Sequence, residues 1–135
     1  MNVVLVDDSP KIRRVLKSLL SDIQGLRIVG EADDAPEALE LCRTMNPDVA
    51  VLDIQMPNGS GIDLLRQIKQ IQPAPVVMMF TGMHQSQYRL ACEKAGSDYY
   101  FVKPSDIDSL HEAMETLAGR ASPQILCAEE SKQLQ

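Results

Sequence analysis

Five short apolar runs divide this chain, and the stretches between them carry apolar residues at helical spacing. The runs occupy residues 3–6, 26–30, 49–52, 76–80 and 99–102. Strands that are apolar throughout are typical of a parallel sheet with helices on both faces. Because right-handed crossovers leave few topologies open, this alternation predicts an α/β fold of the (βα)5 type with one doubly wound parallel sheet.

The segments between the runs contain signals for where helices begin and end. Ser9 is suited to cap a first helix that starts at Pro10, and we expect Gly25 to end that helix. Further helices are expected over residues 35–45, 64–71, 85–95 and 107–117. The helix at 85–95 has the weakest pattern, because few of its side chains are large and apolar.

Length and charge narrow the class of protein. A chain of 135 residues suits one domain with one core, and its net charge of −6 disfavours direct binding of nucleic acid. Only four apolar residues precede the first two acids, which excludes a signal peptide at this N-terminus. No run approaches the roughly 18 apolar residues of a membrane helix, so we expect no membrane insertion and a cytoplasmic location.

The cysteines and the end of the chain complete this outline. The three cysteines, Cys42, Cys92 and Cys127, have irregular spacing and an odd count, which predicts reduced thiols. Residues 121–123 are typical of a linker, and residues 124–135 show no strong apolar period. We therefore expect one domain over residues 1–119, followed by a C-terminal tail or linker over residues 120–135.

Four of the five runs end at side chains suited to metal or phosphate chemistry. These are Asp7 and Asp8 after the first run, Asp53 after the third, Thr81 after the fourth and Lys103 after the fifth. Only the run at 26–30 ends without a comparable group. The carboxyl ends of parallel strands lie along one edge of a sheet, where α/β proteins bind their ligands. We therefore expect the five side chains to form one site.

Three neighbouring carboxylates imply a cation. Like charges this close raise one another's pKa unless a positive ion neutralises them, and oxygen ligands suit Mg²⁺ or Mn²⁺. The backbone carbonyl of Gln55, in the shaped turn after Asp53, can reach the same ion. A carboxylate beside such a metal can act as a nucleophile toward a phosphoryl donor, while a lysine and a hydroxyl bind the phosphoryl oxygens.

These residues resemble the receiver domain of two-component response regulators, the CheY-like superfamily. The resemblance covers about residues 2–118 and rests on motifs in the expected order: Asp7-Asp8, Leu52-Asp53-Ile54-x-Met56-Pro57-x-x-x-Gly61, Phe80-Thr81-Gly82 and Ala95-Gly96-x-Asp98-Tyr99-x-x-Val102-Lys103-Pro104. It implies a flavodoxin-like sheet with strand order 2-1-3-4-5.

The resemblance also implies a role for each site residue. Asp53 would accept a phosphoryl group from the phosphohistidine of a sensor histidine kinase or a phosphotransfer protein. Asp7, Asp8, Asp53 and the Gln55 carbonyl would hold Mg²⁺, and Lys103 would contact the phosphoryl oxygens.

A second group of residues would transmit the signal. Thr81, with the small Gly82 beside it, would move toward the phosphoryl group, and Tyr100 would swing inward with Thr81. The fourth helix, fifth strand and fifth helix would then present a face to a downstream partner or a second copy of the chain. Gln55 and Met83 occupy positions where the family varies its phosphoryl lifetime. His84 is expected to end a loop or cap the fourth helix, and neither His84 nor His111 lies in a phosphodonor context.

Two other classes of protein fit the pattern less well. A haloacid-dehalogenase-like phosphatase with an aspartyl nucleophile needs Asp-x-Asp after the first strand, whereas Asp7 and Asp8 are adjacent. A dinucleotide-binding domain needs G-x-G-x-x-G there, which is absent. We therefore expect a switch rather than an enzyme. A stand-alone receiver is favoured, and the alternative is the N-terminal part of a larger regulator with a DNA-binding output domain.

Overall fold

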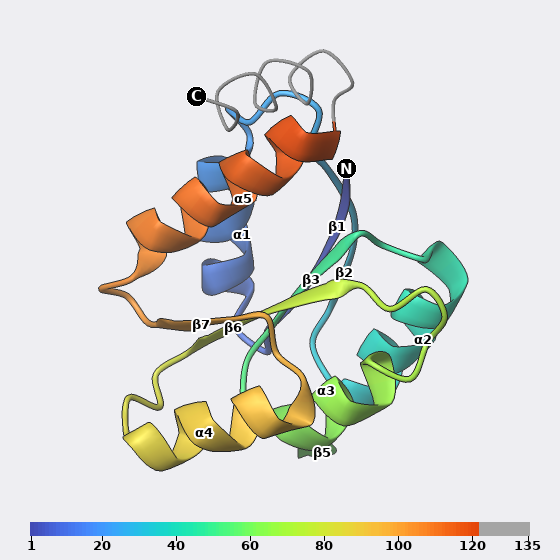
Figure 1. The fold of residues 1–135 in the computed structure, drawn as a ribbon, viewed down its shortest axis with the longest axis vertical. Helices are drawn as coiled ribbons and strands as arrows, with labels where there is room; N and C mark the ends of the chain where they lie inside the picture. Colours follow the sequence, from blue (N-terminus) through green and yellow to red (C-terminus); the bar gives the residue numbers. More distant parts are fainter. Residues whose placement is uncertain (122–135) are drawn as a thin grey trace, which may run out of the picture.

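The computed structural model describes residues 1–121 and contains a five-stranded parallel sheet between two layers of helices (Figure 1). The strand order is β2-β1-β3-β6-β7. The strands are β1 (Asn2–Val6), β2 (Arg27–Ala32), β3 (Val49–Leu52), β6 (Val76–Thr81) and β7 (Tyr99–Val102). The helices are α1 (Pro10–Leu20), α2 (Ala35–Met45), α3 (Gly61–Ile68), α4 (Ser86–Ala95) and α5 (Ile107–Ala121). The predicted fold class is confirmed. Because β6 and β7 are the fourth and fifth strands of the main sheet, its order is the predicted 2-1-3-4-5.

Alternation along the strands creates two cores. Val3 and Leu5 pack with α1 and α5, while Val4 and Val6 pack with α2, α3 and α4. Successive side chains of a strand point to opposite faces, so a strand buried on both sides is apolar at every position. Figure 1 shows the same division, with α1 and α5 on one side of the sheet and the other three helices on the opposite side.

A short hairpin leads from the sheet into α3. Its strands, β4 (Gln55–Met56) and β5 (Gly59–Ser60), pair antiparallel across a turn in which Asn58 has φ 59° and Gly59 has φ 148°. Asparagine and glycine tolerate such angles better than other residues. The hydroxyl of Ser60 then caps α3 by accepting from Ile62 N–H at 3.1 Å. The predicted turn after Asp53 is therefore a structured hairpin.

The first helix and second strand differ from prediction. Helix α1 begins at Pro10 with Ser9 as its N-cap, as expected, but it ends at Leu20 rather than at Gly25. Its last turn tightens into bonds such as Ile23 N–H to the Leu20 carbonyl, and Gly25 lies in the following turn with φ 85°. Strand β2 continues to Ala32 and is followed by two acids. The prediction that the second strand ends without a side chain suited to metal or phosphate chemistry is therefore wrong.

Helices α3, α4 and α5 also differ from prediction in where they begin or end. Helix α3 ends at Ile68, because the next residues form three-residue turns, so Ile71 lies outside it. The N-cap of α4 is Gln85, which rules out capping by His84. Helix α5 runs to Ala121, two residues beyond the expected domain boundary, and the rest of the expected tail, including Cys127, lies outside the described residues.

Two of the three cysteines agree with expectation. Cys42 and Cys92 are free and fully buried. Within residues 1–121, no helix combines the length and the apolar character that crossing a membrane requires.

Candidate functional site

Three carboxylates meet where β1 and β3 end. The two strands pair in register through Val6 and Leu52, so Asp7 and Asp53 follow directly from neighbouring positions. Ligand oxygens of Asp7, Asp8 and Asp53 all lie within 4.8 Å of one another. Asp7 and Asp53 are buried, at 3% and 5% exposure, whereas Asp8 is exposed to solvent. The predicted cluster therefore forms, with one side open.

Lys103 reaches this cluster from the end of the edge strand β7. Its backbone N–H donates to the Thr81 carbonyl at 2.8 Å, which fixes the residue just beyond β7. Its Nζ then lies 2.6 Å from Asp7 Oδ2 and 2.8 Å from Asp53 Oδ2. The ammonium thus bridges two carboxylates contributed by two different strands.

Burial and hydrogen bonding act against each other in this site. Burial raises the pKa of Asp7, the Lys103 and Ser9 hydrogen bonds oppose that rise, and the charge of Asp53 adds to it. A raised carboxylate pKa was predicted, but burial rather than like charge is its main cause. Burial alone would lower the pKa of Lys103, yet its hydrogen bonds to Asp53 and Asp7, together with the charges of these two carboxylates, outweigh burial and raise it.

The charge balance suits a divalent cation. When all three acids are ionised, one ammonium leaves two negative charges unbalanced. The exposed carboxylate of Asp8 leaves an approach from solvent. A set of carboxylate oxygens with room for waters matches the preference of Mg²⁺. The residues present therefore fit the expected metal.

The hairpin after Asp53 folds back onto it. The backbone N–H of Gln55 donates to Asp53 Oδ1 at 3.3 Å, which places residue 55 at the carboxylate cluster. Gly61 N–H donates to the Ile54 carbonyl at 2.8 Å. A Cβ on Gly61 would lie 1.9 Å from the Asp53 carbonyl oxygen, so no side chain fits there. This close approach explains the fixed spacing of the motif.

Thr81 and Tyr100 meet at the backbone of Met83. Thr81 is fully buried, and its hydroxyl oxygen accepts from Met83 N–H at 3.3 Å. Tyr100 is 7% exposed and its hydroxyl donates to the Met83 carbonyl. Burial raises the pKa of Tyr100 to about 12, so the hydroxyl keeps its proton. The ring already occupies the inward position, and a Cβ on Gly82 would meet no atom within 4 Å.

Two arginines contact the site in ways that the sequence analysis missed. Arg13 of α1 donates to the Asp7 carbonyl and pairs with Glu31 at 3.0 Å. Arg89 of α4 lies over the ring of Tyr100, with its Cζ 4.8 Å from the ring centroid. Arg13 lies one helical turn after the N-cap Ser9, and this spacing could have placed it near the end of β1. No local pattern marks Arg89, because its contact depends on how α4 packs against β7.

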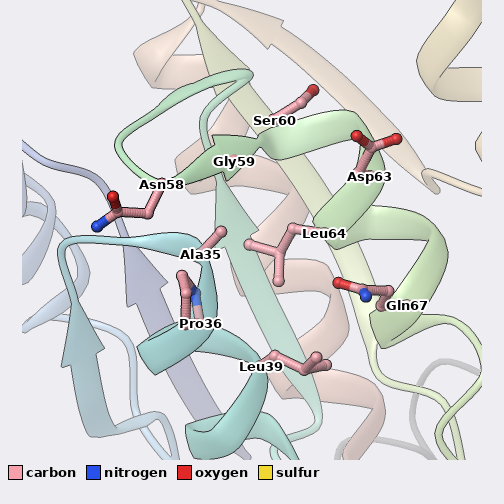
Figure 2. A pocket seen from close by; sticks show the side chains of 9 residues that line it. All are labelled: Ala35, Pro36, Leu39, Asn58, Gly59, Ser60, Asp63, Leu64 and Gln67. Carbon is pink, nitrogen blue, oxygen red and sulfur yellow. The ribbon is translucent and has the colours of Figure 1, made fainter.

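A nearby hollow is not a second reactive site. It lies between α2 and α3 and has a volume of about 310 Å³. Its lining is apolar except for Asn58, Ser60, Asp63 and Gln67 (Figure 2). Asp63 is the only ionisable residue in the lining, and it pairs with Arg66 at 2.9 Å. The hollow therefore lacks the clustered charges of the strand ends.

Comparison with known proteins identifies the family. The chain matches the response regulator receiver domain over residues 3–115. It belongs to this family. Similar curated proteins and solved structures include further response regulators.

Three relatives illustrate the range. The chain is 43% identical over 103 residues to a protein-glutamate methylesterase/protein-glutamine glutaminase of Rhizobium etli, which covers 76% of this chain and 30% of that protein. A two-component response regulator of the LuxR family from Aurantimonas sp. is 32% identical with a TM-score of 0.80, covering 99% of this chain and 98% of that one. The CheX-CheY-BeF3-Mg complex from Borrelia burgdorferi gives 28% identity and a TM-score of 0.78, over 87% of this chain and 88% of that one. This chain thus spans less than a third of the methylesterase.

Proposed function

We propose that this receiver accepts a phosphoryl group on Asp53 from the phosphohistidine of a sensor histidine kinase or a phosphotransfer protein. The observation that carries the proposal is the buried Asp53 carboxylate with the Lys103 ammonium 2.8 Å away and two further acids beside it. An oxygen of Asp53 would form the new P–O bond while the P–N bond of the donor breaks, and the imidazole would leave with that electron pair.

Under this proposal Asp7, Asp8, Asp53 and the Gln55 carbonyl hold Mg²⁺ or Mn²⁺. The bound metal would neutralise the carboxylates and polarise the phosphoryl oxygens. The Borrelia relative was crystallised with BeF3 and Mg, which supports this assignment for a homologous site. Lys103 would exchange part of its pairing with Asp53 for a phosphoryl oxygen, and the Thr81 hydroxyl would donate to another.

Phosphorylation of Asp53 would change the conformation of the receiver and so transmit a signal. The reshaped face of α4, β7 and α5 would bind a downstream protein or a second copy of the chain. The domain would turn over only its own acyl phosphate, so it would not act as an enzyme on other molecules. We place this activity in the cytoplasm. Direct contact with nucleic acid is not expected, because the chain carries a net charge of −6.

A second candidate is that the receiver controls an output domain in the same polypeptide. The match covers 30% of the Rhizobium methylesterase, so receivers of this kind occur within longer chains. An immunoblot of the native organism separates the two candidates. A band near 14.9 kDa supports the stand-alone receiver, and a larger band supports the fused regulator.

Phosphorylation by acetyl phosphate and Mg²⁺ tests the acceptor. Intact-mass measurement should show one hydroxylamine-sensitive phosphoryl group on the wild-type protein and none on Asp53→Asn. The matched control Asp63→Asn removes an exposed carboxylate of α3 and should be labelled like wild type. Chelation of the metal should prevent labelling. Robust labelling of Asp53→Asn, mapped to Asp7 or Asp8, would overturn the assignment.

A further inference from the structure

Besides its packing in the core, Tyr100 makes specific contacts with the β6–α4 loop and with α4. The hydroxyl donates to the Met83 carbonyl, and the guanidinium of Arg89 lies over the ring. The N–H of Met83 donates to the Thr81 hydroxyl. The ring, the buried threonine and the start of α4 are therefore linked through one peptide segment.

Tyr100 is buried overall, but it also borders an open hollow. Arg89 and Tyr100 line a hollow of about 290 Å³ between α4 and β7, together with Glu93 one turn further along the helix. Among residues 1–121, Arg89 has no ion pair with a carboxylate, although Glu93 lies four residues away. The ring of Tyr100 is the interaction partner that the described part of the chain gives this guanidinium.

We propose that Arg89 is a positioning residue that holds Tyr100 inward through a cation–π contact and thereby favours the phosphorylated state of the receiver. The proposal rests on the proposed function, because it concerns regulation of the same site. A ring that leaves the inward position loses the contact with Arg89. The contact therefore stabilises one state over the other, which is the condition for shifting an equilibrium between them.

Linkage then sets the size of the effect. A cation–π contact at a partly exposed site is modest, and its loss corresponds to a population change of about two- to fivefold. A ligand that binds the inward state more tightly should therefore lose affinity when the cation is removed, by at most the same factor.

The experiment titrates the full chain with beryllofluoride in Mg²⁺, where BeF₃⁻ stands in for the phosphoryl group on Asp53. The ring resonances of Tyr100 are followed by NMR with ¹³C-labelled tyrosine, and they are told apart from those of Tyr88 and Tyr99 by their absence in a Tyr100→Leu variant. In Arg89→Met the apparent dissociation constant should rise, by up to about fivefold, and the Tyr100 resonances should move away from their wild-type positions. Arg89→Lys keeps the cation and should recover most of the affinity.

Two controls separate positioning from other effects. Lys94→Met removes a cation from the last turn of α4, and it should leave affinity and the Tyr100 resonances unchanged. In a Tyr100→Leu background, Arg89→Met should have no further effect. Wild-type behaviour of Arg89→Met, or an equal loss of affinity in the Tyr100→Leu background, would overturn the inference.

Failure of the proposed function gives a different result. If wild-type protein does not bind beryllofluoride in Mg²⁺, the phosphoacceptor assignment falls. The Tyr100 resonances of Arg89→Met against wild type then decide alone whether the arginine holds the ring. Unchanged resonances would overturn the inference in that case as well.

Discussion

At the scale of single residues, the geometry at Gly61 leaves no room for a side chain. A Cβ there would sit 1.9 Å from the carbonyl oxygen of Asp53, an atom of rigid backbone. We expect Gly61→Ala to force the hairpin away from the site, with a loss of about 1–3 kcal/mol in the free energy of unfolding. Urea denaturation measures this loss, and acetyl phosphate labelling should slow in the same variant.

Gly82→Ala is the matched control for that prediction. It adds the same methyl group at a glycine near the site, where a Cβ meets no heavy atom within 4 Å. Its free energy of unfolding should stay within about 0.5 kcal/mol of wild type. Equal stability of the two variants would show that the hairpin can move without cost.

Residues whose positions are fixed by strand ends were predictable, and residues that reach a site by their own length were not. Asp7, Asp53 and Lys103 follow apolar runs, so the sheet itself carries them to one edge. Arg13 and Arg89 make their contacts through long side chains on helices. Those contacts depend on the packing of a helix against the sheet, which local sequence does not specify.

At the scale of elements, helix α4 differs from its neighbours in how it begins. The side chains of Ser9, Asp34 and Ser60 cap α1, α2 and α3, whereas Gln85 makes no side-chain cap bond. The only fully buried residue of α4 is Cys92. Its weak apolar pattern in the sequence therefore corresponds to weak attachment at its start and along its length.

Supplying the missing cap should stabilise α4. Gln85 already has the extended backbone of an N-cap, with φ −69° and ψ 141°. In Gln85→Ser the hydroxyl can accept from an N–H of the first turn, which should raise the free energy of unfolding by about 0.5–1 kcal/mol. Amide exchange in α4 should slow, while Gln87→Ser, inside the helix, should show no such gain. Unchanged exchange in Gln85→Ser would contradict this account of α4.

Element boundaries were less predictable than the elements themselves. The sequence predicts that Gly25 ends α1, but hydrogen bonds from Ser21 N–H to the Ser18 carbonyl and from Ile23 N–H to the Leu20 carbonyl close the helix earlier. Strand β2 extends through Glu31 even though that residue is charged. This is possible because β2 is an edge strand and Glu31 pairs with Arg13 and Lys17 of α1. Ion pairs across elements are tertiary contacts, so apolar periodicity alone ends the strand too soon.

At the scale of the whole molecule, two separate cores place the functional residues on one edge between them. The core of α1 and α5 and the core of α2, α3 and α4 each take alternate residues of the same strands. The strand ends are therefore packed on both sides, whereas α4 has fewer buried side chains than the other helices of its layer. This combination gives a rigid carboxylate cluster beside a helix that can shift at low cost.

The α1–α5 layer also contains an ion pair that makes stability depend on pH. His111 of α5 lies with Nε2 2.8 Å from Asp22 Oδ1 and Nδ1 3.5 Å from Glu115 Oε1. The hydrogen bond to Asp22 raises the pKa of His111, with smaller contributions from the charges of Asp22, Glu115 and Asp108. A raised pKa means that the folded state binds the proton more tightly than the unfolded chain. The stabilisation is therefore complete below the ordinary value of 6.5 and is lost as the pH rises through the folded-state pKa.

We expect His111→Gln to be less stable than wild type at pH 5.5 and nearly equal to it at pH 8.5. Asp22 is 71% exposed at its side chain, so solvent screens the pair and the difference at low pH should be at most about 1 kcal/mol. Urea denaturation of both proteins at the two pH values measures it, and the comparison cancels the titration of all other groups. Asp22→Asn should remove most of the same pH-dependent term, and high salt should shrink it because the pair is exposed. A difference between wild type and His111→Gln that is the same at both pH values would mean that the imidazole stabilises the layer by packing rather than by charge.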